Sequence, residues 1–225
     1  MIKVVFLDVD NTLLDFNACA NWAIQMAAEE AKISFSDGLC REFHRVNNQL
    51  WKHVETGEYT KEYIFSIRWD KIFAEFGIRY DGVKFESIFH RYVSLSHQKV
   101  DFAEELLQYL SPKYLLCAAS NAHHKEQCVR LESAGLLSYF QHVFTSQSVD
   151  APKPGKAFFD ACFSQLDGVQ PHEAVMIGDS PSADISGGTD YGMQTVWFNF
   201  ENKECPADCH PTYTVDSLSE ICNIL

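Results

Sequence analysis

The sequence predicts an α/β protein in which a parallel, doubly wound sheet carries helices on both faces, giving three layers. Apolar, strand-forming runs alternate with helical stripes from about residue 101 to the end of the chain. The first such run, residues 2–7, lacks the polar alternation of a half-exposed strand, which is typical of a central parallel strand. Residues 16–96 show only helical periodicity, which indicates a helical domain inserted after the first strand.

Two carboxylates follow this first strand. Asp8 and Asp10 come directly after the apolar run, and open α/β sheets bind ligands at the carboxyl ends of their strands. Carboxylates this close repel one another, and burial increases the repulsion, unless a cation or a shared proton compensates. The alternative is structural, because aspartate is also a common turn residue. The position at a strand end favours a functional pair of acids.

After the insertion, strands and helices alternate, as expected for a parallel sheet with crossover helices. The chain therefore divides into a core of residues 1–15 and 97–225 and a helical domain of residues 16–96. A glycine-rich stretch, residues 178–188, precedes one of the later strands. The remaining predicted strands are 114–119, 143–145, 174–177, 194–198 and 213–215, and the predicted core helices are 103–110, 122–134, 157–166 and one from residue 217.

Further strand ends carry residues that a phosphoryl-transfer site requires. Ser120 and Asn121 follow a strand and precede a helix, where a hydroxyl and backbone amides form an anion site. An ordinary serine N-cap is the alternative. Lys153 lies between two prolines that stiffen its loop, although a single lysine is more often simply solvated. Asp179 follows a glycine at the end of another strand, with Asp184 five residues further on.

In this order, the segments resemble the four motifs of the haloacid dehalogenase-like (HAD) hydrolase superfamily across essentially the whole chain. The resemblance implies a HAD-like Rossmannoid core and an all-helical cap domain formed by residues 16–96. The matching segments are Asp8-Val9-Asp10-Asn11-Thr12, Ser120-Asn121, Lys153, and Gly178-Asp179-Ser180 with Asp184.

Magnesium is the expected cofactor. Phosphate esters are anionic, so a carboxylate cluster repels them unless a hard divalent cation intervenes, and Mg²⁺ prefers oxygen ligands. Asp8 and Asp179 are the expected side-chain ligands, and the resemblance implies the main-chain carbonyl of Asp10 as a third. Asp184 is expected to accept a hydrogen bond from metal-bound water, with direct ligation as the alternative. Thr12 is expected to stabilise the turn after the first strand.

The catalytic roles follow from this arrangement and from the resemblance. Asp8 would attack phosphorus in line and form an aspartyl-phosphate. The resemblance implies that Asp10 protonates the leaving alkoxide and then deprotonates the hydrolytic water. Because a poorly activated alkoxide needs such an acid, Asp10 favours phosphate esters over halogenated substrates. Ser120, Asn121 and Lys153 would bind the phosphoryl oxygens and offset charge in the transition state.

The helical domain is expected to select the substrate. Asn47, Trp51 and Tyr59 lie in a segment that resembles the cap of the noncanonical pyrimidine 5′-nucleotidases, with a similar asparagine, leucine-tryptophan pair and glycine-containing turn. The resemblance implies nucleoside monophosphates, particularly pyrimidine ones, as the substrate class. An aromatic ring in the cap can stack on a base. Packing within the helical domain is the alternative role for Trp51.

These observations predict a magnesium-dependent phosphatase that hydrolyses a small phosphate monoester, with a pyrimidine nucleoside 5′-monophosphate as the favoured substrate. The enzymatic alternatives are a sugar-phosphate or phosphoglycolate phosphatase and a phosphomutase of the same fold, because the four motifs do not separate them. A non-catalytic binding module that has lost turnover is the alternative from another class.

Composition restricts partners and compartment. The 18 basic and 31 acidic residues give a formal net charge of −13, which argues against binding a nucleic-acid polymer. No apolar run approaches the roughly 20 residues of a membrane span, and Met1 leads directly into a strand. The eight cysteines suit free thiols in a reducing compartment. We expect a cytoplasmic monomer or homodimer that acts on a small phosphorylated metabolite.

Overall fold

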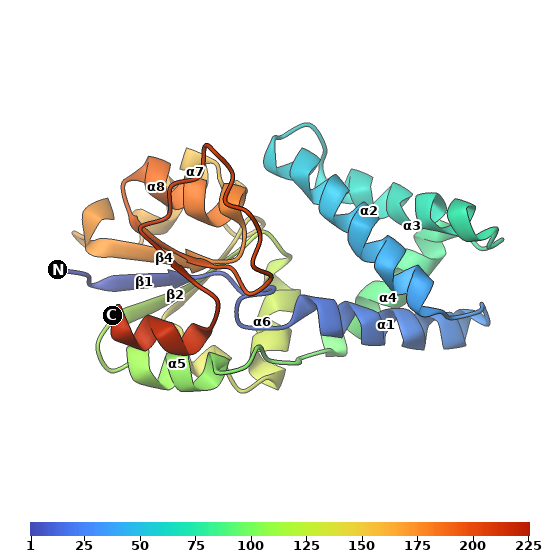
Figure 1. The fold of residues 1–225 in the computed structure, drawn as a ribbon, viewed down its shortest axis with the longest axis horizontal. Helices are drawn as coiled ribbons and strands as arrows, with labels where there is room; N and C mark the ends of the chain where they lie inside the picture. Colours follow the sequence, from blue (N-terminus) through green and yellow to red (C-terminus); the bar gives the residue numbers. More distant parts are fainter. The chain divides into compact units, whose positions relative to one another are not determined.

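The computed structural model describes residues 1–225, which divide into two compact units (Figure 1). The core unit comprises residues 1–15 and 97–225, and the helical unit comprises residues 16–96. The strands are β1 (Val4–Leu7), β2 (Leu115–Ser120), β3 (His142–Thr145), β4 (Ala174–Gly178), β5 (Gln194–Phe198) and β6 (Tyr213–Val215). The helices are α1 (Phe16–Ala31), α2 (Asp37–Glu55), α3 (Lys61–Phe76), α4 (Gly82–Leu95), α5 (Ala103–Leu110), α6 (His124–Ser133), α7 (Lys156–Phe163) and α8 (Gly187–Tyr191). Shorter helical turns are η1 (Leu137–Tyr139), η2 (Pro171–Glu173), η3 (Pro181–Ser186) and η4 (Leu218–Asn223).

A six-stranded sheet forms the centre of the core unit, and all its strand pairs are parallel. The strand order is β3-β2-β1-β4-β5-β6, which confirms the predicted parallel α/β fold. The chain runs from β1 through β2 to β3 on one side, and then crosses to β4, β5 and β6 on the other. The order therefore reverses between β1 and β4, and open sheets bind ligands in the crevice at such a switch point.

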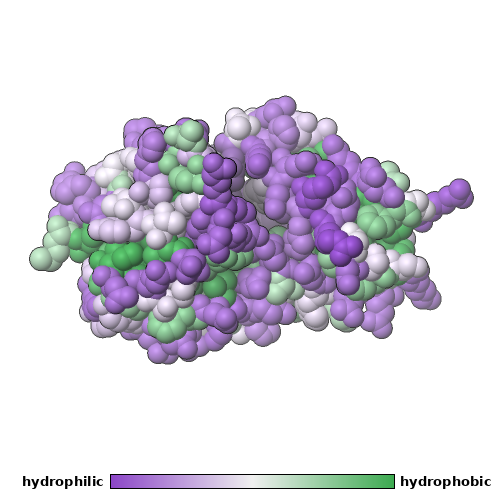
Figure 2. Space-filling model, in the orientation of Figure 1, coloured by the Kyte–Doolittle hydropathy of each residue, from purple (hydrophilic) through white to green (hydrophobic).

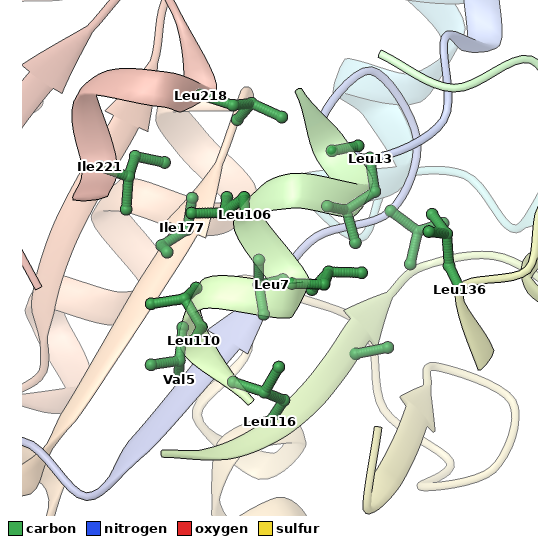
Figure 3. Close-up of a cluster of buried hydrophobic side chains, with 14 of the residues drawn as sticks. Val5, Leu7, Leu13, Leu106, Leu110, Leu116, Leu136, Ile177, Leu218 and Ile221 are labelled. Carbon is green, nitrogen blue, oxygen red and sulfur yellow. The ribbon is translucent and has the colours of Figure 1, made fainter. Parts of the chain in front are cut away.

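Side chains of β1 point alternately into two apolar layers, because successive residues of a strand face opposite sides of the sheet. Val5 and Leu7 pack in one cluster with Leu106 of α5 (Figure 3). Phe6 faces the other way and packs in a cluster with Phe158 of α7. Helix α5 covers one face of the sheet, and α7 and α8 cover the other (Figure 1). Burial on both faces explains why the β1 sequence shows no polar alternation.

The two chain segments that flank the helical unit are hydrogen-bonded to each other within the core unit. The N–H of Asp15 donates to the carbonyl of Gln98 at 2.9 Å. The N–H of Val100 donates to the carbonyl of Leu13 at 3.0 Å. The chain therefore leaves the core unit and returns to it through adjacent segments.

Four helices, α1 to α4, make up the helical unit and confirm the predicted helical insertion after the first strand. Ser36, Thr60 and Asp81 precede α2, α3 and α4, and each accepts a hydrogen bond from the backbone N–H three residues ahead, as an N-cap does. The fully buried Trp69 of α3 lies among aromatic rings that form the centre of this unit. Those rings belong to Phe43, Phe73, Phe85 and Phe89.

A buried ion pair joins α3 to α4 inside the helical unit. Nε and Nη2 of Arg68 donate to the two carboxylate oxygens of Glu86 at 2.6 and 2.5 Å. Nη1 of Arg68 donates to Oδ1 of Asn47 at 2.9 Å. Burial opposes ionisation of Glu86, but Arg68 and the contact with His90 outweigh it, so the pKa of Glu86 is lowered.

We expect Arg68→Met to lower the free energy of unfolding by about 3–5 kcal/mol, because it leaves the Glu86 carboxylate buried without its main partner. Denaturant unfolding followed by circular dichroism would measure the change. Arg45→Met is the matched control, since Arg45 pairs with Glu42 on an exposed face of α2. Loss of an exposed pair costs at most about 1 kcal/mol. Equal losses in the two variants would contradict a stabilising role for the buried pair.

Hydrophilic residues occupy most of the surface visible in Figure 2, in keeping with a formal net charge of −13. The exposed large apolar side chains of the helical unit include Phe35, Tyr63, Val83 and Leu95. None of the helices combines the length and the apolar character that crossing a membrane requires.

Candidate active site

Three carboxylates converge at the switch point of the sheet. Asp8 follows β1, Asp179 follows β4, and Asp184 lies in η3. Their ligand oxygens all lie within 4.8 Å of one another. Gly178 makes this approach possible, because a Cβ at that position would collide with the Asp184 carboxylate. The cluster therefore requires a residue without a side chain immediately before Asp179.

Lys153 places a buried ammonium group among these acids. Its Nζ donates to Oδ1 of Asp8 at 2.8 Å, to Oδ1 of Asp184 at 2.6 Å and to the carbonyl of Ala119 at 2.6 Å. These three acceptors match the three protons of an ammonium group. Burial opposes the charge of Lys153, but the two carboxylates outweigh it and raise the pKa of the lysine.

When ionised, the acids of the cluster would carry more negative charge than Lys153 neutralises. Burial raises the pKa of Asp8 to about 7, with Lys153 opposing the rise and Asp184 adding to it. Burial and the same neighbouring acids raise the pKa of Asp179 well above its usual range. With all three carboxylates ionised, the ammonium leaves two negative charges, which a divalent cation would balance. Oxygen ligands around such an excess suit Mg²⁺, so the cluster is a candidate metal site.

We expect Mg²⁺ to stabilise the folded protein, and to do so more strongly at about pH 7.5 than at about pH 5. The raised pKa values of Asp8 and Asp179 mean that the folded state binds protons more tightly than the unfolded chain. Their contribution to stability is therefore full at low pH, and for Asp8 it is lost as the pH rises through about 7. A cation replaces those protons above that pH, and a hundredfold excess over its Kd adds about 2.7 kcal/mol.

Thermal unfolding with and without MgCl₂ at both pH values would measure this effect. Asp179→Asn should lose most of the magnesium-dependent rise in Tm, because it removes one of the three carboxylates. A rise of the same size in that variant would contradict the assignment of the metal site.

The turn after β1 orients the two acids of the first motif. The carbonyl of Val9 accepts a hydrogen bond from the N–H of Leu13 at 2.9 Å, and Asn11 has a positive φ of 61°. Thr12 is buried, and its Oγ1 donates to Oδ2 of Asp8 at 3.3 Å. The threonine thus contacts the acid directly as well as lying in the turn.

Asp10 is held by two residues of α6 that the four sequence motifs do not include. Nη1 of Arg130 donates to Oδ1 of Asp10 at 2.6 Å, and Nε2 of Gln127 donates to Oδ2 at 2.7 Å. Both α6 side chains are buried, whereas the Asp10 side chain is 27% exposed. In the sequence, the only sign of this pair is that Gln127 and Arg130 are three residues apart on the helix after Ser120, which places them on one helix face. This sign is weak.

Ser120 ends β2 and is linked to Asp10 through Gln127. Its Oγ accepts hydrogen bonds from the N–H of Ala122 at 3.1 Å and from Nε2 of Gln127 at 2.9 Å. A hydroxyl with both acceptor positions filled has its own hydrogen left to donate. This orientation suits a contact with an anionic oxygen.

Asn121 joins two of the motif segments. Its side-chain amide donates to the carbonyl of Lys153 at 2.9 Å, and its Oδ1 accepts from the N–H of Lys153 at 2.8 Å. Oγ of Ser146 donates to the Asn121 carbonyl at 2.9 Å. These contacts fix the backbone that carries Lys153. Direct phosphate contacts by Asn121 and Lys153 stay predictions.

The three candidate substrate residues of the helical unit each have packing partners there. Asn47 is buried and accepts the hydrogen bond from Arg68. Trp51 is half-buried and packs against the apolar centre of the unit. The ring of Tyr59 lies 4.7 Å from that of His53, measured between centroids. Contacts of Asn47, Trp51 and Tyr59 with a substrate stay predictions.

Acids at the switch point of a parallel sheet and a helical insertion after its first strand are the architecture of one class of hydrolases. The family model described as haloacid dehalogenase-like hydrolase matches residues 2–192, and the chain belongs to this family. The helical insertion matches the cap of the family.

The chain is similar over nearly its full length to several known proteins. HAD-hydrolase YfnB of Bacillus subtilis is 30% identical over 99% of this chain and 95% of YfnB. A magnesium-bound crystal structure of YfnB gives a TM-score of 0.95 at 29% identity, covering 100% of this chain and 98% of YfnB. Pyrimidine 5′-nucleotidase PynA of Streptococcus pneumoniae is 31% identical over 99% of this chain and 94% of PynA. Pyrimidine 5′-nucleotidase YjjG of Escherichia coli is 28% identical over 98% of this chain and 96% of YjjG.

Proposed function

We propose that this protein is a magnesium-dependent phosphatase that hydrolyses a pyrimidine nucleoside 5′-monophosphate or a similar small phosphate monoester. The observation that carries the proposal is the cluster of Asp8, Asp179 and Asp184 around the buried Lys153 ammonium. Membership of a hydrolase family supports the reaction class. The relatives PynA and YjjG, both pyrimidine 5′-nucleotidases, support the substrate class.

Asp8 is the proposed nucleophile. Its Oδ1 accepts from Lys153 at 2.8 Å and its Oδ2 from Thr12 at 3.3 Å, so the carboxylate is oriented by both oxygens. Attack by a carboxylate oxygen on phosphorus breaks the ester bond, releases the alcohol and leaves an aspartyl-phosphate. Water then attacks this intermediate, which regenerates the carboxylate and releases inorganic phosphate.

Asp8, Asp179 and the carbonyl of Asp10 are the proposed holders of Mg²⁺. When bound, the ion would offset the negative charge on the phosphate oxygens. Both carboxylate oxygens of Asp184 already have donors, since Lys153 donates to Oδ1 at 2.6 Å and the N–H of Ser180 to Oδ2 at 3.0 Å. Asp184 is therefore proposed to hold Lys153 in place, with direct ligation of the ion as the alternative role.

The remaining proposed roles are proton transfer, binding of the phosphoryl group and recognition of the base. Asp10 is the proposed acid for the leaving oxygen and the proposed base for the hydrolytic water. Ser120, with its hydroxyl hydrogen free to donate, is proposed to bind a phosphoryl oxygen together with backbone amides. In the helical unit, Trp51 and Tyr59 offer rings that can stack on a base.

Phosphate release from a panel of esters, assayed with MgCl₂ and with EDTA, tests the proposal. We expect turnover only with the metal, and the highest kcat/KM for pyrimidine nucleoside monophosphates. Sugar phosphates and phosphoglycolate belong in the same panel, because preference for one of them would redirect the substrate class. A mutase would convert a sugar phosphate without releasing inorganic phosphate. If folded protein with metal turns over no ester, the proposal fails and a binding module remains.

A further inference from the structure

Two buried polar residues of α6 connect the ends of β1 and β2. Nε2 of Gln127 lies 2.7 Å from Oδ2 of Asp10 and 2.9 Å from Oγ of Ser120. Nη1 of Arg130 lies 2.6 Å from Oδ1 of Asp10 and 3.1 Å from Oε1 of Gln127. The four side chains thus form a continuous hydrogen-bonded network from the first motif to the second.

Placing these groups inside the protein is costly, because a buried guanidinium and a buried amide give up their hydration. Apolar side chains could hold α6 against the sheet without that cost, and the neighbouring Leu131 does so within the main apolar cluster. The contacts that Gln127 and Arg130 make with Asp10 and Ser120 therefore explain this polar pair better than packing does. Its partner Asp10 is partly open to solvent, so the network ends at the surface of the site.

The network fixes the orientation of two groups. Asp10 has a donor on each carboxylate oxygen, from Arg130 on one and Gln127 on the other, so the plane of the carboxyl group is set. Ser120 accepts from Gln127 and from the backbone N–H of Ala122, so the direction of its own hydrogen is set as well. Gln127 takes part in both, because its amide nitrogen has two hydrogens.

We propose that Gln127 and Arg130 are positioning residues of this enzyme. They hold the Asp10 carboxyl group toward the leaving oxygen, and Gln127 in addition holds the Ser120 hydroxyl toward the transferred phosphoryl group. This inference rests on the proposed phosphatase function and deepens it.

Two esters that differ in their leaving group separate this role from a structural one. A nucleoside monophosphate releases an alkoxide that needs an acid, whereas p-nitrophenyl phosphate releases a stabilised phenolate that needs little. Arg130→Gln should lower kcat/KM for the nucleotide by about 10- to 100-fold, as misplacement of a catalytic group does, and kcat/KM for p-nitrophenyl phosphate by less than about threefold. The comparison uses kcat/KM because this constant includes only the steps up to release of the alcohol, whereas the later attack of water, for which Asp10 is the proposed base, is common to both esters. Arg130→Lys should restore part of the lost rate, because it retains the charge.

Gln127→Met tests the contact between Gln127 and Ser120. Methionine has a shape similar to that of glutamine, so the substitution leaves no cavity. Because it removes the donor to Ser120, it should lower kcat/KM for both esters and raise the inhibition constant of inorganic phosphate by about 3- to 10-fold, with a further loss of kcat/KM for the nucleotide. Arg130→Lys should leave that inhibition constant unchanged. If Arg130→Gln does not fold, the same comparison of the two esters is made with Gln127→Met and Arg130→Lys.

Lys125→Gln is the matched control, since Lys125 is exposed on the same helix, and it should change none of these constants. In an Asp10→Asn background, Arg130→Gln should cause no further loss of kcat/KM for the nucleotide, because the group that it positions is gone. If Arg130→Gln lowered kcat/KM equally for the two esters, or caused its full loss in the Asp10→Asn background as well, the inference would be overturned. The two α6 residues would then have only a structural role. Wild-type protein that hydrolyses neither ester would instead overturn the proposed function itself.

Discussion

Asp8→Asn is expected to abolish phosphate release, with kcat falling by a factor on the order of 10⁴ or more. The amide lacks the nucleophilic charge, yet it has the size of the carboxylate and retains an oxygen that can accept from Lys153. The fold should therefore persist. Because the substitution removes one of three mutually repelling acids, we expect unchanged or increased stability at about pH 7.5.

Steady-state phosphate release and thermal unfolding of the same preparations would check both parts of this expectation. Asp190→Asn is a suitable control, because Asp190 is an exposed aspartate of the core unit, and it should retain full activity. Equal activity in wild type and Asp8→Asn would mean that the measured phosphate comes from a contaminating enzyme.

Lys153→Met is expected to reduce activity and stability together. It leaves Asp8 and Asp184 buried without their shared cation, and breaking a buried ion pair from one side costs about 3–5 kcal/mol. Loss of a preorganised positive group should also lower kcat/KM on the order of 10²- to 10³-fold. The destabilisation should be smaller at about pH 5, because the pKa of Asp8 is already raised to about 7 and its carboxylate takes up a proton there.

Denaturant unfolding at the two pH values, together with ester turnover, would measure these effects. Lys156→Met provides a close comparison, since Lys156 lies three residues further along the chain and pairs with Asp160 on the exposed side of α7. That substitution should change the free energy of unfolding by no more than about 0.5 kcal/mol and leave turnover intact. A pH-independent loss in Lys153→Met would argue against charge as the cause.

The strands can be predicted from the sequence because each central strand is buried on both faces and therefore appears as an unbroken apolar run. The predicted strands 174–177 and 194–198 match β4 and β5 to within one residue. Helix α8 begins at the end of the glycine-rich stretch and has no apolar stripe. Gly188 allows it to pack closely, since a Cβ there would lie 2.9 Å from the Thr195 side chain and 3.0 Å from that of Met176. Close packing of this kind replaces the apolar stripe that usually reveals a helix.

The acids of the site could be found because topology alone brings the ends of β1 and β4 together. The contacts of Lys153 and Arg130 depend on burial, and sequence patterns rarely show it for charged residues. A lysine between prolines or an arginine in a polar helix is normally solvated, and only the surrounding carboxylates permit burial here. The strand-end residues are therefore predictable from the sequence, whereas the helix residues that hold them are not.

The paired segments around Leu13 and Val100 have an evolutionary consequence. Because both ends of the inserted region are fastened side by side on the core, that region can be exchanged for another of different length without disturbing the sheet. An exchange at this position can thus alter the helical unit while the strand ends and their acids keep their places.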